Sequence, residues 1–375
     1  MPTNEIRVKT AGGPYGVLVE PGALARLAAE LSNGGLKAAA TPSRPEPVAQ
    51  RPLFVITDSN VWKHWGRAFD AAVSPLRYGL IKIRPGEERK KLETVERISE
   101  RLVALGADRG TLLIAFGGGV VGDIGGFVAS VYLRGVDYVQ APTTLLAQID
   151  SSVGGKTGVN LPCGKNLVGS FYQPKRVIAD PRVFRTLPQR ELRAGLYEAI
   201  KCGMLRRSLF VFIEKRREAL LRKDPEVLAE LVRGCVGLKA WVVTHDEREG
   251  GLRRILNLGH TVGHALESET GYRRFLHGEA VAWGLRAATL LAEDRGMIRP
   301  AEAARIHALV KAMGPLPPLP RISAARLASR LLADKKTRGG AVHFVLPEAI
   351  GRVRIVTGIE PRSVARVLER LRSGQ

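Results

Sequence analysis

The sequence predicts an α/β, Rossmann-like nucleotide-binding domain over residues 1–185 and a mostly α-helical domain over residues 186–375. Three observations lead to this prediction. Short apolar runs alternate with helix-like segments in the first half, which is typical of a parallel sheet covered by helices. A glycine-rich stretch at 117–123 directly follows one of these runs. From Pro188 onward, long segments with helical periodicity dominate.

In the first half, four apolar runs are predicted to be buried strands, and residues 88–105 are predicted to be a helix with one charged face. The runs are 53–58 (LFVITD), 111–116 (TLLIAF), 137–144 (DYVQAPTT) and 176–180 (RVIAD). Residues 37–52 are rich in alanine and proline, and we expect a surface loop there without a function of its own.

The second half contains helical patterns that follow one another with short connections, and one pair of strand-like runs near its end. The helical patterns cover 189–205, 208–222, 225–244, 260–270, 279–295, 300–313 and 323–333. The strand-like runs are AVHFVLP at 341–347 and GRVRIV at 351–356.

Composition limits the classes of function. A length of 375 residues favours two domains. The net charge of +22 suits either nucleic acid or small anionic substrates. Because the basic residues are spread along the whole chain, aromatic residues make up only 6% and no nucleic-acid motif is present, we expect no nucleic-acid partner.

The cysteines and the amino terminus indicate the compartment. Cys163, Cys202 and Cys235 form no C-x-x-C pair, which suits a reducing cytoplasm. No apolar run reaches the roughly 18 residues of a membrane-spanning helix. The first residues, MPTNEIRVKT, lack the apolar core of a secretory signal. We therefore expect a cytoplasmic protein with no membrane partner.

Gly117, Gly119 and Gly122 have the G-x-G-x-x-G spacing and come after a predicted strand. Glycines at this spacing let the backbone approach a pyrophosphate, and the helix that follows offers its N–H groups and its positive end. No acidic residue follows at the usual distance to hold the ribose. Asp58, at the end of an earlier predicted strand, is the candidate for that role.

Residues 143–166, TTLLAQIDSSVGGKTGVNLPCGKN, are rich in hydroxyls, glycines and lysines. The P-loop pattern is not met, because Asp150 stands six residues before Lys156, where that pattern requires glycine. We interpret the segment as polar and flexible, holding its lysines near phosphate oxygens and a cofactor. A solvated loop is the alternative.

Three of the seven histidines, His260, His264 and His277, lie close together in the sequence. His260 and His264 are four residues apart, so one helical face could present both to a metal. The alternative is a helix start with one hydrogen-bonded core histidine and one solvated histidine. Glu198 and Lys201 share a face at three-residue spacing, and a surface ion pair is the alternative there. With His260 and His277, Glu198 would complete a three-ligand set of the kind found in catalytic zinc sites.

Taken together, the motifs of the chain resemble those of the 3-dehydroquinate synthase family over nearly its whole length. The matching motifs are PGEERK (85–90), GGGVVGD (117–123), YLRG (132–135), TTLLAQIDSSVGGKTGVN (143–160), GKN (164–166), FRTLP (184–188), EAIK (198–201), DEREGGLRRILNLGHTVGHALE (246–267), LHGEAV (276–281) and DKK (334–336).

The resemblance implies a carbon–oxygen lyase of the shikimate pathway, which converts 3-deoxy-D-arabino-heptulosonate 7-phosphate into 3-dehydroquinate and phosphate. It implies transient oxidation by NAD⁺, elimination of phosphate, re-reduction and intramolecular aldol closure. It also implies a divalent metal, Zn²⁺ or Co²⁺, a dehydroquinate synthase-like fold with its site between a nucleotide-binding domain and a metal- and substrate-binding domain, and a cytoplasmic homodimer.

The resemblance further implies roles for individual residues. The metal ligands would be Glu198, His260 and His277, and His264 would lie beside the substrate and help to move protons. The NAD⁺ contacts would be Asp58, Glu87, Lys90, Gly118, Gly119, Asp123, Thr143, Thr144 and Thr186. The boundary between cofactor and substrate would be lined by Asp150, Lys156, Lys165 and Asn166. The substrate contacts would be Arg134 (from the partner subunit), Lys201, Lys239, Glu249, Arg253, Asn257 and one or both of Lys335 and Lys336.

Tyr197 and Cys202 depart from the family pattern beside Glu198 and Lys201, and we interpret both as packing changes that leave the metal ligands intact. Three alternatives stay open. The first is another sugar phosphate cyclase, of the 2-deoxy-scyllo-inosose or 2-epi-5-epi-valiolone synthase type. The others are a metal-dependent polyol dehydrogenase and a basic nucleic-acid-binding protein. The intact SSVGGKTGVN and GKN motifs favour the dehydroquinate branch.

Overall fold

The computed structural model describes residues 4–32, 51–332 and 342–374, so the predicted surface loop at 37–52 lies almost entirely outside the described residues. The chain divides into two compact units. The first comprises Met1–Leu187 and Pro225–Glu247, and the second comprises Pro188–Asp224 and Arg248–Gln375. An α/β unit and a mostly helical unit confirm the predicted fold class.

A seven-stranded sheet forms the centre of the first unit, in the order β1-β2-β9-β6-β5-β3-β4. The edge pair β1–β2 is antiparallel and all other neighbours are parallel. The strands are β1 (Glu5–Val8), β2 (Tyr15–Val19), β3 (Leu53–Asp58), β4 (Gly79–Ile83), β5 (Leu112–Gly117), β6 (Asp137–Pro142) and β9 (Arg176–Ala179). The predicted central strands are continuous apolar runs because helices cover both faces of a parallel sheet.

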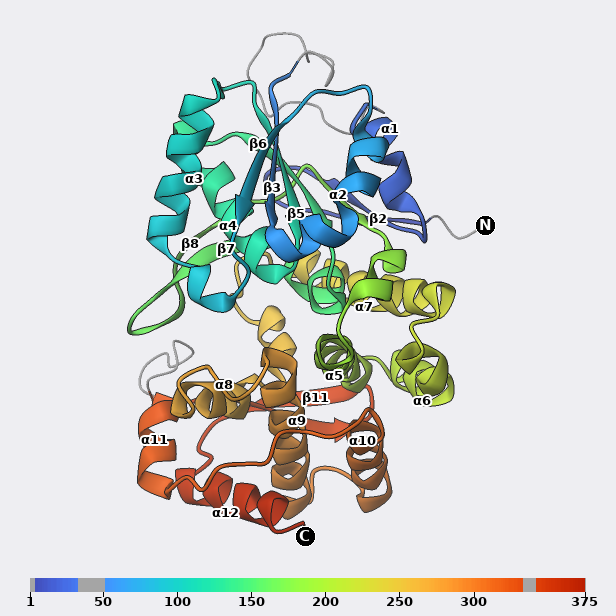
Figure 1. Ribbon diagram of the computed structural model, residues 1–375. Coiled ribbons are helices and arrows are strands. Elements are labelled where there is room, and N and C mark those ends of the chain that lie inside the picture. The colour runs from blue at the N-terminus through green and yellow to red at the C-terminus, as the bar shows by residue number, and fades with distance from the viewer. Residues whose placement is uncertain (1–3, 33–50, 333–341, 375) are drawn as a thin grey trace. The chain divides into compact units, whose positions relative to one another are not determined.

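Helices cover the sheet of the first unit. They are α1 (Leu27–Ser32), α2 (Ser59–Val73), α3 (Leu92–Ala104), α4 (Gly119–Val131) and α7 (Pro225–His245). Figure 1 shows strands β3, β5 and β6 running between α3 on one side and α1 and α2 on the other. Buried side chains of α3 and α4, such as Ile98 and Val128, pack in one core cluster with Ile56 and Leu113 of the sheet.

Short helical turns connect these elements. They are η1 (Ala23–Arg26), η3 (Glu87–Arg89), η4 (Tyr132–Arg134), η5 (Ala147–Ser151) and η6 (Pro181–Thr186).

Helix α7 lies in a different unit from the one that the sequence predicts for its residues. Its residues were predicted to belong to the second domain, but they form part of the first unit. The helix contacts β1, β2, η5 and η6. The chain therefore forms α5 and α6 in the second unit and then comes back to pack α7 against the first unit. The predicted boundary after residue 185 lies two residues before the division at Leu187 and Pro188.

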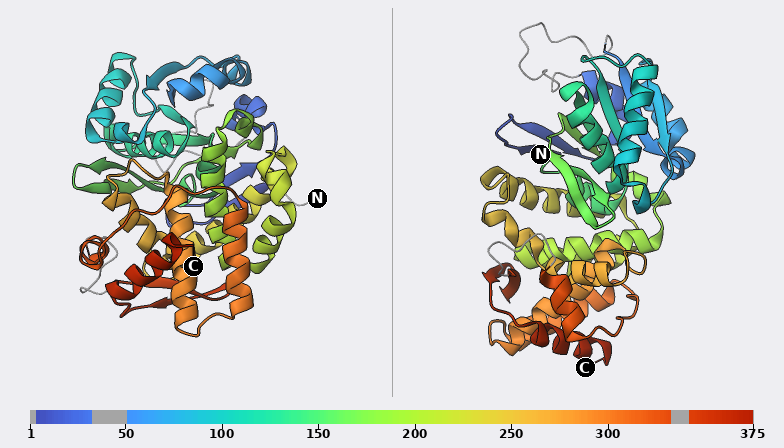
Figure 2. Two further views of the ribbon diagram at one scale, coloured as in Figure 1. Left: turned by 60° about the horizontal axis from the view of Figure 1, so that its bottom comes forward. Right: turned by 90° about the vertical axis from the view of Figure 1, so that its left-hand side faces the viewer.

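The segment predicted to be flexible and polar is partly a regular hairpin, and that part of the prediction is wrong. Strands β7 (Lys156–Leu161) and β8 (Gly164–Phe171) pair antiparallel, and β7 packs on α4. The hairpin is labelled in Figure 1 and is drawn in green in Figure 2. Gly158 and Gly169 lie opposite each other, and a Cβ on Gly169 would stand only 2.1 Å from the Thr157 carbonyl oxygen. The two strands approach closely because glycine occupies these positions.

The second unit is helical, with one two-stranded sheet, and Figure 2 shows it from two further sides. Its helices are α5 (Gln189–Leu205), α6 (Arg207–Leu221), α8 (His260–Glu269), α9 (His277–Asp294), α10 (Pro300–Ala312), α11 (Ala324–Leu332) and α12 (Pro361–Arg372). The turn η7 (Leu252–Asn257) precedes α8, and the strands are β10 (Phe344–Ala349) and β11 (Arg352–Val356). Within the described ranges, no helix combines the length and the apolar character needed to cross a membrane.

Candidate active site

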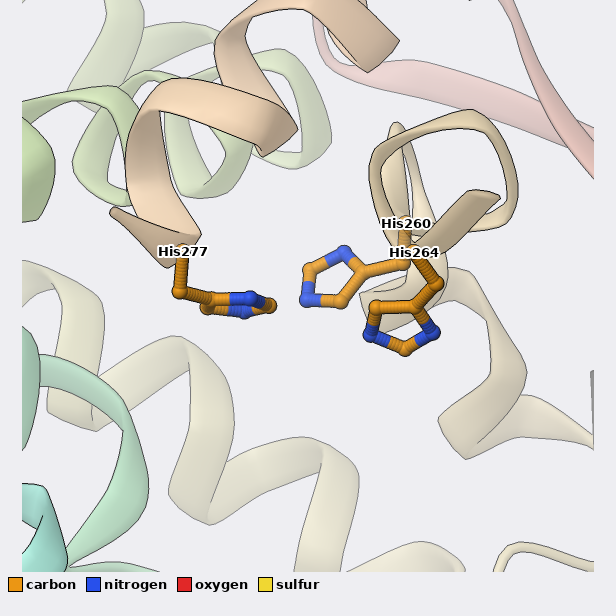
Figure 3. A group of neighbouring side chains, drawn as sticks. All are labelled: His260, His264 and His277. Carbon is orange, nitrogen blue, oxygen red and sulfur yellow. The ribbon is translucent and has the colours of Figure 1, made fainter. Parts of the chain in front are cut away.

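The histidine cluster of the second unit is built on the starts of two helices. His260 is the first residue of α8, His264 lies one turn later, and His277 is the first residue of α9. Figure 3 shows the three rings converging from these two helices. Each ring offers one nitrogen to the cluster, and these three nitrogens lie within 4.8 Å of one another.

Glycines allow the helices around this cluster to pack closely. Gly259, with φ of 78°, is the residue before α8, and a Cβ on Gly284 of α9 would stand 1.8 Å from its carbonyl oxygen. A Cβ on Gly278 would stand 1.9 Å from the carbonyl oxygen of Ala194 in α5. No other residue type fits at these two helix contacts. They bring His277 beside the turn of α5 that carries Glu198.

Glu198 and the two predicted histidine ligands meet in the structure. The Oε1 atom of Glu198 lies 3.3 Å from Nε2 of His277 and 3.6 Å from Nε2 of His260. The Glu198 side chain is fully buried. A buried carboxylate facing two imidazole nitrogens is a donor set that suits a divalent cation such as zinc.

The opposite nitrogen of each ring is fixed by an acceptor. Nδ1 of His277 lies 3.0 Å from Oε2 of Glu267, and Nδ1 of His260 lies 3.2 Å from the Leu258 carbonyl oxygen. A carbonyl oxygen only accepts, so Nδ1 of His260 donates, and its Nε2 atom is the one that faces Glu198. Metal-binding histidines are held by such partners in most proteins. The residues present therefore fit a metal.

The charge around His277 also fits a cation. Burial alone would lower the pKa of His277, but the carboxylates of Glu267 and Glu198 outweigh it and raise the pKa to about 10. Two buried carboxylates beside one ring create a site where a positive charge is strongly favoured.

Lys201 forms an ion pair with Glu198, with 2.7 Å between Nζ and Oε2. The side chains are 3% and 0% exposed, so the alternative of a surface ion pair is excluded. Burying two charges costs several kcal/mol in desolvation and contributes little net stability. A buried ion pair of this kind, on the buried face of α5, therefore indicates a functional site.

His264 also reaches the cluster, and its ring lies edge-on to that of His260 with 5.4 Å between the ring centroids. Distances alone therefore allow two ligand sets, which share His260 and His277 and differ in whether Glu198 or His264 is the third ligand. The assignment of Glu198 as ligand and His264 as proton carrier stays a prediction.

In the first unit, a polar network joins the predicted NAD⁺ contacts. Lys90 is 5% exposed, and its ammonium group contacts both the Asp123 carboxylate and the Asn166 side-chain oxygen. Glu87 accepts a hydrogen bond of 2.8 Å from Asn160. Burial raises the pKa of Asp123, and the neighbouring Lys90 ammonium opposes this effect.

The glycine turn has the predicted context, because Gly117 ends β5 and α4 begins at Gly119. A Cβ on Gly118 would stand 3.0 Å from the Thr144 methyl carbon, so this backbone packs tightly. The Thr143 amide donates to the Gly117 carbonyl oxygen over 2.9 Å. The buried Thr143 hydroxyl has no hydrogen-bond partner among the described residues. An orphaned hydroxyl beside a glycine turn fits a nucleotide that would supply the partner.

Asp58 and Thr186 each have a local structural role as well. The Asp58 carboxylate caps α2 and accepts hydrogen bonds from the amides of Asn60 and Val61 at 2.8 and 3.0 Å. Trp65 donates to the Thr186 hydroxyl over 2.8 Å. Asp58 is the last residue of β3, and Thr186 is the last residue of η6, the turn that follows β9.

Other predicted contacts of the first unit lie as follows. Lys239 of α7 contacts the Asp150 carboxylate of η5 and is 8% exposed. Lys156 begins β7, and Lys165 lies at the start of β8. Arg134 is exposed and has a left-handed backbone, with φ of 69°, directly after Leu133 at 47°. Strained backbone of this kind clusters at functional positions.

In the second unit, Arg253 of η7 is 3% exposed, and Asn257 donates a hydrogen bond of 2.8 Å to Glu249. Glu249 has a left-handed backbone with φ of 61°. The predicted contacts Lys335 and Lys336 lie outside the described residues.

Two side chains of the site were not predicted. Glu267 lies three residues after His264 and seven after His260, so helical spacing places all three on one face of α8. That spacing could have identified it. Asn160 stands within the matched motif at 143–160, but no local pattern distinguishes its side chain from those of its neighbours.

The buried Lys90–Asp123 pair gives a stability prediction. Asp123→Asn is expected to lower the free energy of unfolding by about 3 kcal/mol, because the Lys90 ammonium is left without its counter-charge. Urea unfolding followed by circular dichroism measures this. Lys91→Met, at the exposed Lys91–Glu93 pair nearby, is the control and should change it by less than about 1 kcal/mol. Equal effects of the two variants would contradict the structural role given to Lys90.

Comparison with known proteins identifies the family. The model described as 3-dehydroquinate synthase N-terminal matches residues 80–194, and the model described as 3-dehydroquinate synthase C-terminal matches residues 195–337. A 3-dehydroquinate synthase from Solibacter usitatus (strain Ellin6076) is 49% identical over 82% of this chain and 87% of its own length. The chain belongs to the 3-dehydroquinate synthase family. The resemblance found in the sequence is confirmed.

Solved structures of related cyclases share the fold. A 2-epi-5-epi-valiolone synthase from Streptomyces hygroscopicus subsp. jinggangensis 5008, with NAD⁺ and Zn²⁺ bound, has a TM-score of 0.86 and 28% identity, covering 96% of this chain and 97% of its own. A 2-deoxy-scyllo-inosose synthase, complexed with carbaglucose-6-phosphate, NAD⁺ and Co²⁺, has a TM-score of 0.81 and 25% identity, covering 97% and 99%. Identity to the dehydroquinate synthase relative is clearly higher than to either cyclase, which favours a 3-dehydroquinate synthase over the other sugar phosphate cyclases.

Proposed function

We propose that this member of the family converts 3-deoxy-D-arabino-heptulosonate 7-phosphate into 3-dehydroquinate and phosphate. The observation that carries the proposal is the identity to a curated 3-dehydroquinate synthase across most of the chain. The convergence of Glu198, His260 and His277 in one buried site supports it, because this reaction class needs a Lewis acid.

The proposal includes NAD⁺ and a divalent metal. When bound, NAD⁺ would supply reversible hydride transfer at the C5 alcohol, and the metal, Zn²⁺ or Co²⁺, would supply a Lewis acid for that alcohol. Glu198, His260 and His277 would hold the metal. Glu87, Lys90, Asp123 and Thr143 are among the residues that would hold the nucleotide, with the Thr143 hydroxyl gaining the partner it lacks.

The chain's own residues would bind and orient the anionic substrate. Lys201 and Arg253 are buried cations of the second unit that suit the carboxylate and phosphate of a sugar phosphate. His264 stands beside the proposed ligands, and imidazole is the side chain that most often transfers protons in catalysis. Positioning and electrostatic stabilisation would supply most of the rate enhancement.

We further propose a cytoplasmic homodimer in which Arg134 reaches the partner subunit. Arg134 is exposed on a left-handed turn, and its neighbours Val131 and Leu133 are 46% and 39% exposed. Arginine is enriched at interfaces between proteins, and the exposed apolar side chains beside it add surface that association would bury.

One assay tests the proposed reaction. The purified protein is incubated with the heptulosonate phosphate, NAD⁺ and Zn²⁺, and phosphate release is followed together with NADH absorbance. We expect phosphate release without net NADH, abolished by a chelator. Absence of phosphate release with all components present would overturn the proposal. Glucose 6-phosphate is tested as well, because the related inosose synthase binds carbaglucose-6-phosphate. Phosphate release from glucose 6-phosphate instead would indicate an enzyme of that type, and net NADH formed with a simple polyol would indicate a dehydrogenase.

A further inference from the structure

We infer that Asn160 is a positioning residue that holds the β7–β8 hairpin onto the cofactor-contact residues of η3. Nothing in the sequence motifs gives its side chain a role. The inference rests on the proposed function, because it takes Glu87, Lys90 and Asn166 as contacts to the nucleotide and the substrate.

Asn160 connects two segments that are about 70 residues apart in the sequence. Its amide donates to the Lys90 carbonyl oxygen over 2.7 Å, and its side-chain Nδ2 donates to Oε1 of Glu87 over 2.8 Å. Its side-chain Oδ1 accepts from the Asn166 amide over 2.9 Å. One residue thus binds η3 once, the residue directly after η3 once, and the opposite strand of its own hairpin once.

The network closes through Lys90. The Lys90 ammonium contacts the side-chain oxygen of Asn166 and the carboxylate of Asp123 in α4. Asn166 has φ of 52°, a left-handed conformation that asparagine tolerates better than most residues. Its amide is fixed by Asn160 and its side chain by Lys90. Three predicted contacts, Glu87, Lys90 and Asn166, therefore depend on Asn160 for their mutual placement.

Only a carboxamide satisfies both side-chain contacts of Asn160. Glu87 needs a donor and the Asn166 amide needs an acceptor, and an asparagine side chain offers one of each. An aspartate would keep the contact to Asn166 and place a second carboxylate against Glu87. The other charged groups that face this point are Lys90, directly after η3, and Asp123 of α4.

The test is direct measurement of NAD⁺ binding by titration calorimetry, at about pH 8 and about pH 5.5. Asn160→Asp is expected to weaken NAD⁺ binding about tenfold at the higher pH, because two facing carboxylates repel each other. At the lower pH, a proton shared between the new carboxylate at position 160 and Glu87 should restore most of the affinity for NAD⁺. Asn160→Ala should weaken binding similarly at both pH values, and Asn160→Gln should fall between it and the wild type.

The controls separate this role from a general effect on folding. Asn4 donates from Nδ2 to Glu20 over 3.2 Å at an exposed site of the same unit, so Asn4→Asp repeats the chemical change elsewhere and should leave binding unchanged. Thermal unfolding of every variant is recorded. Wild-type affinity in Asn160→Asp at both pH values, or a loss independent of pH, would overturn the inference. A wild type that does not bind NAD⁺ would instead overturn the proposed function, and the inference with it.

Discussion

Glu198→Gln is expected to remove the bound metal and to lower turnover by at least about 100-fold. The carboxylate oxygen that faces His260 and His277 is replaced by a neutral amide group, which binds a divalent cation poorly. Metal content by atomic emission and phosphate release together measure the effect. The loss of metal should parallel the loss of activity.

Two further variants separate the loss of a metal ligand from other effects of the substitution. Glu191→Gln changes a half-buried carboxylate of the same helix, and should keep both metal and activity. Glu198→Gln also deprives the buried Lys201 of its counter-charge, so Glu198→Gln/Lys201→Met should recover unfolding stability without recovering metal. Full metal occupancy in Glu198→Gln would show that Glu198 is not a ligand.

His264→Ala is expected to keep stoichiometric metal while turnover falls by about 100-fold or more. His260→Ala should lose the metal itself. The reason is that Nε2 of His260 faces Glu198 with its Nδ1 held by the Leu258 carbonyl oxygen, whereas His264 is assigned to proton movement. Metal analysis of both purified variants, alongside the phosphate assay, checks this.

The comparison of these two histidines decides between the ligand sets that the distances allow. If His264→Ala loses metal as completely as His260→Ala, the three histidines form the site and the assignment of Glu198 is wrong. A conservative His264→Gln variant should regain little activity, because an amide cannot transfer a proton as imidazole does.

Much of the fold could be predicted because its elements carry strong local patterns. The run at 53–58 is buried along most of its length as β3, and the helical pattern at 189–205 coincides with α5. Continuous apolar runs and long amphipathic segments depend little on what packs against them, so local spacing was sufficient.

Other elements could not be predicted because contacts with distant parts of the chain determine them. The β7–β8 hairpin is polar and glycine-rich, and it forms because Gly158 and Gly169 let its strands approach and α4 supports one face. Helix α7 has an ordinary helical pattern, which says nothing of the unit it joins. Its place is set by packing against β1, β2 and η5.

The candidate site shows the same division. The histidine spacing indicated a metal, and helical spacing would have added Glu267. The burial of Glu198 could not be read locally, because its pairing with Lys201 has the same spacing as a surface ion pair. That burial follows from α9 packing against α5 through Gly278. Asn160 was missed because its partners lie in η3, far away in the sequence.

X-ray absorption at the zinc edge tests the central claim most directly. The zinc-loaded protein is compared with zinc-loaded His264→Ala. We predict two imidazole nitrogens and one carboxylate oxygen from the protein around zinc, at about 2.0–2.2 Å, with the same spectrum in both proteins. A spectrum with three imidazole nitrogens that falls to two in His264→Ala would contradict the account.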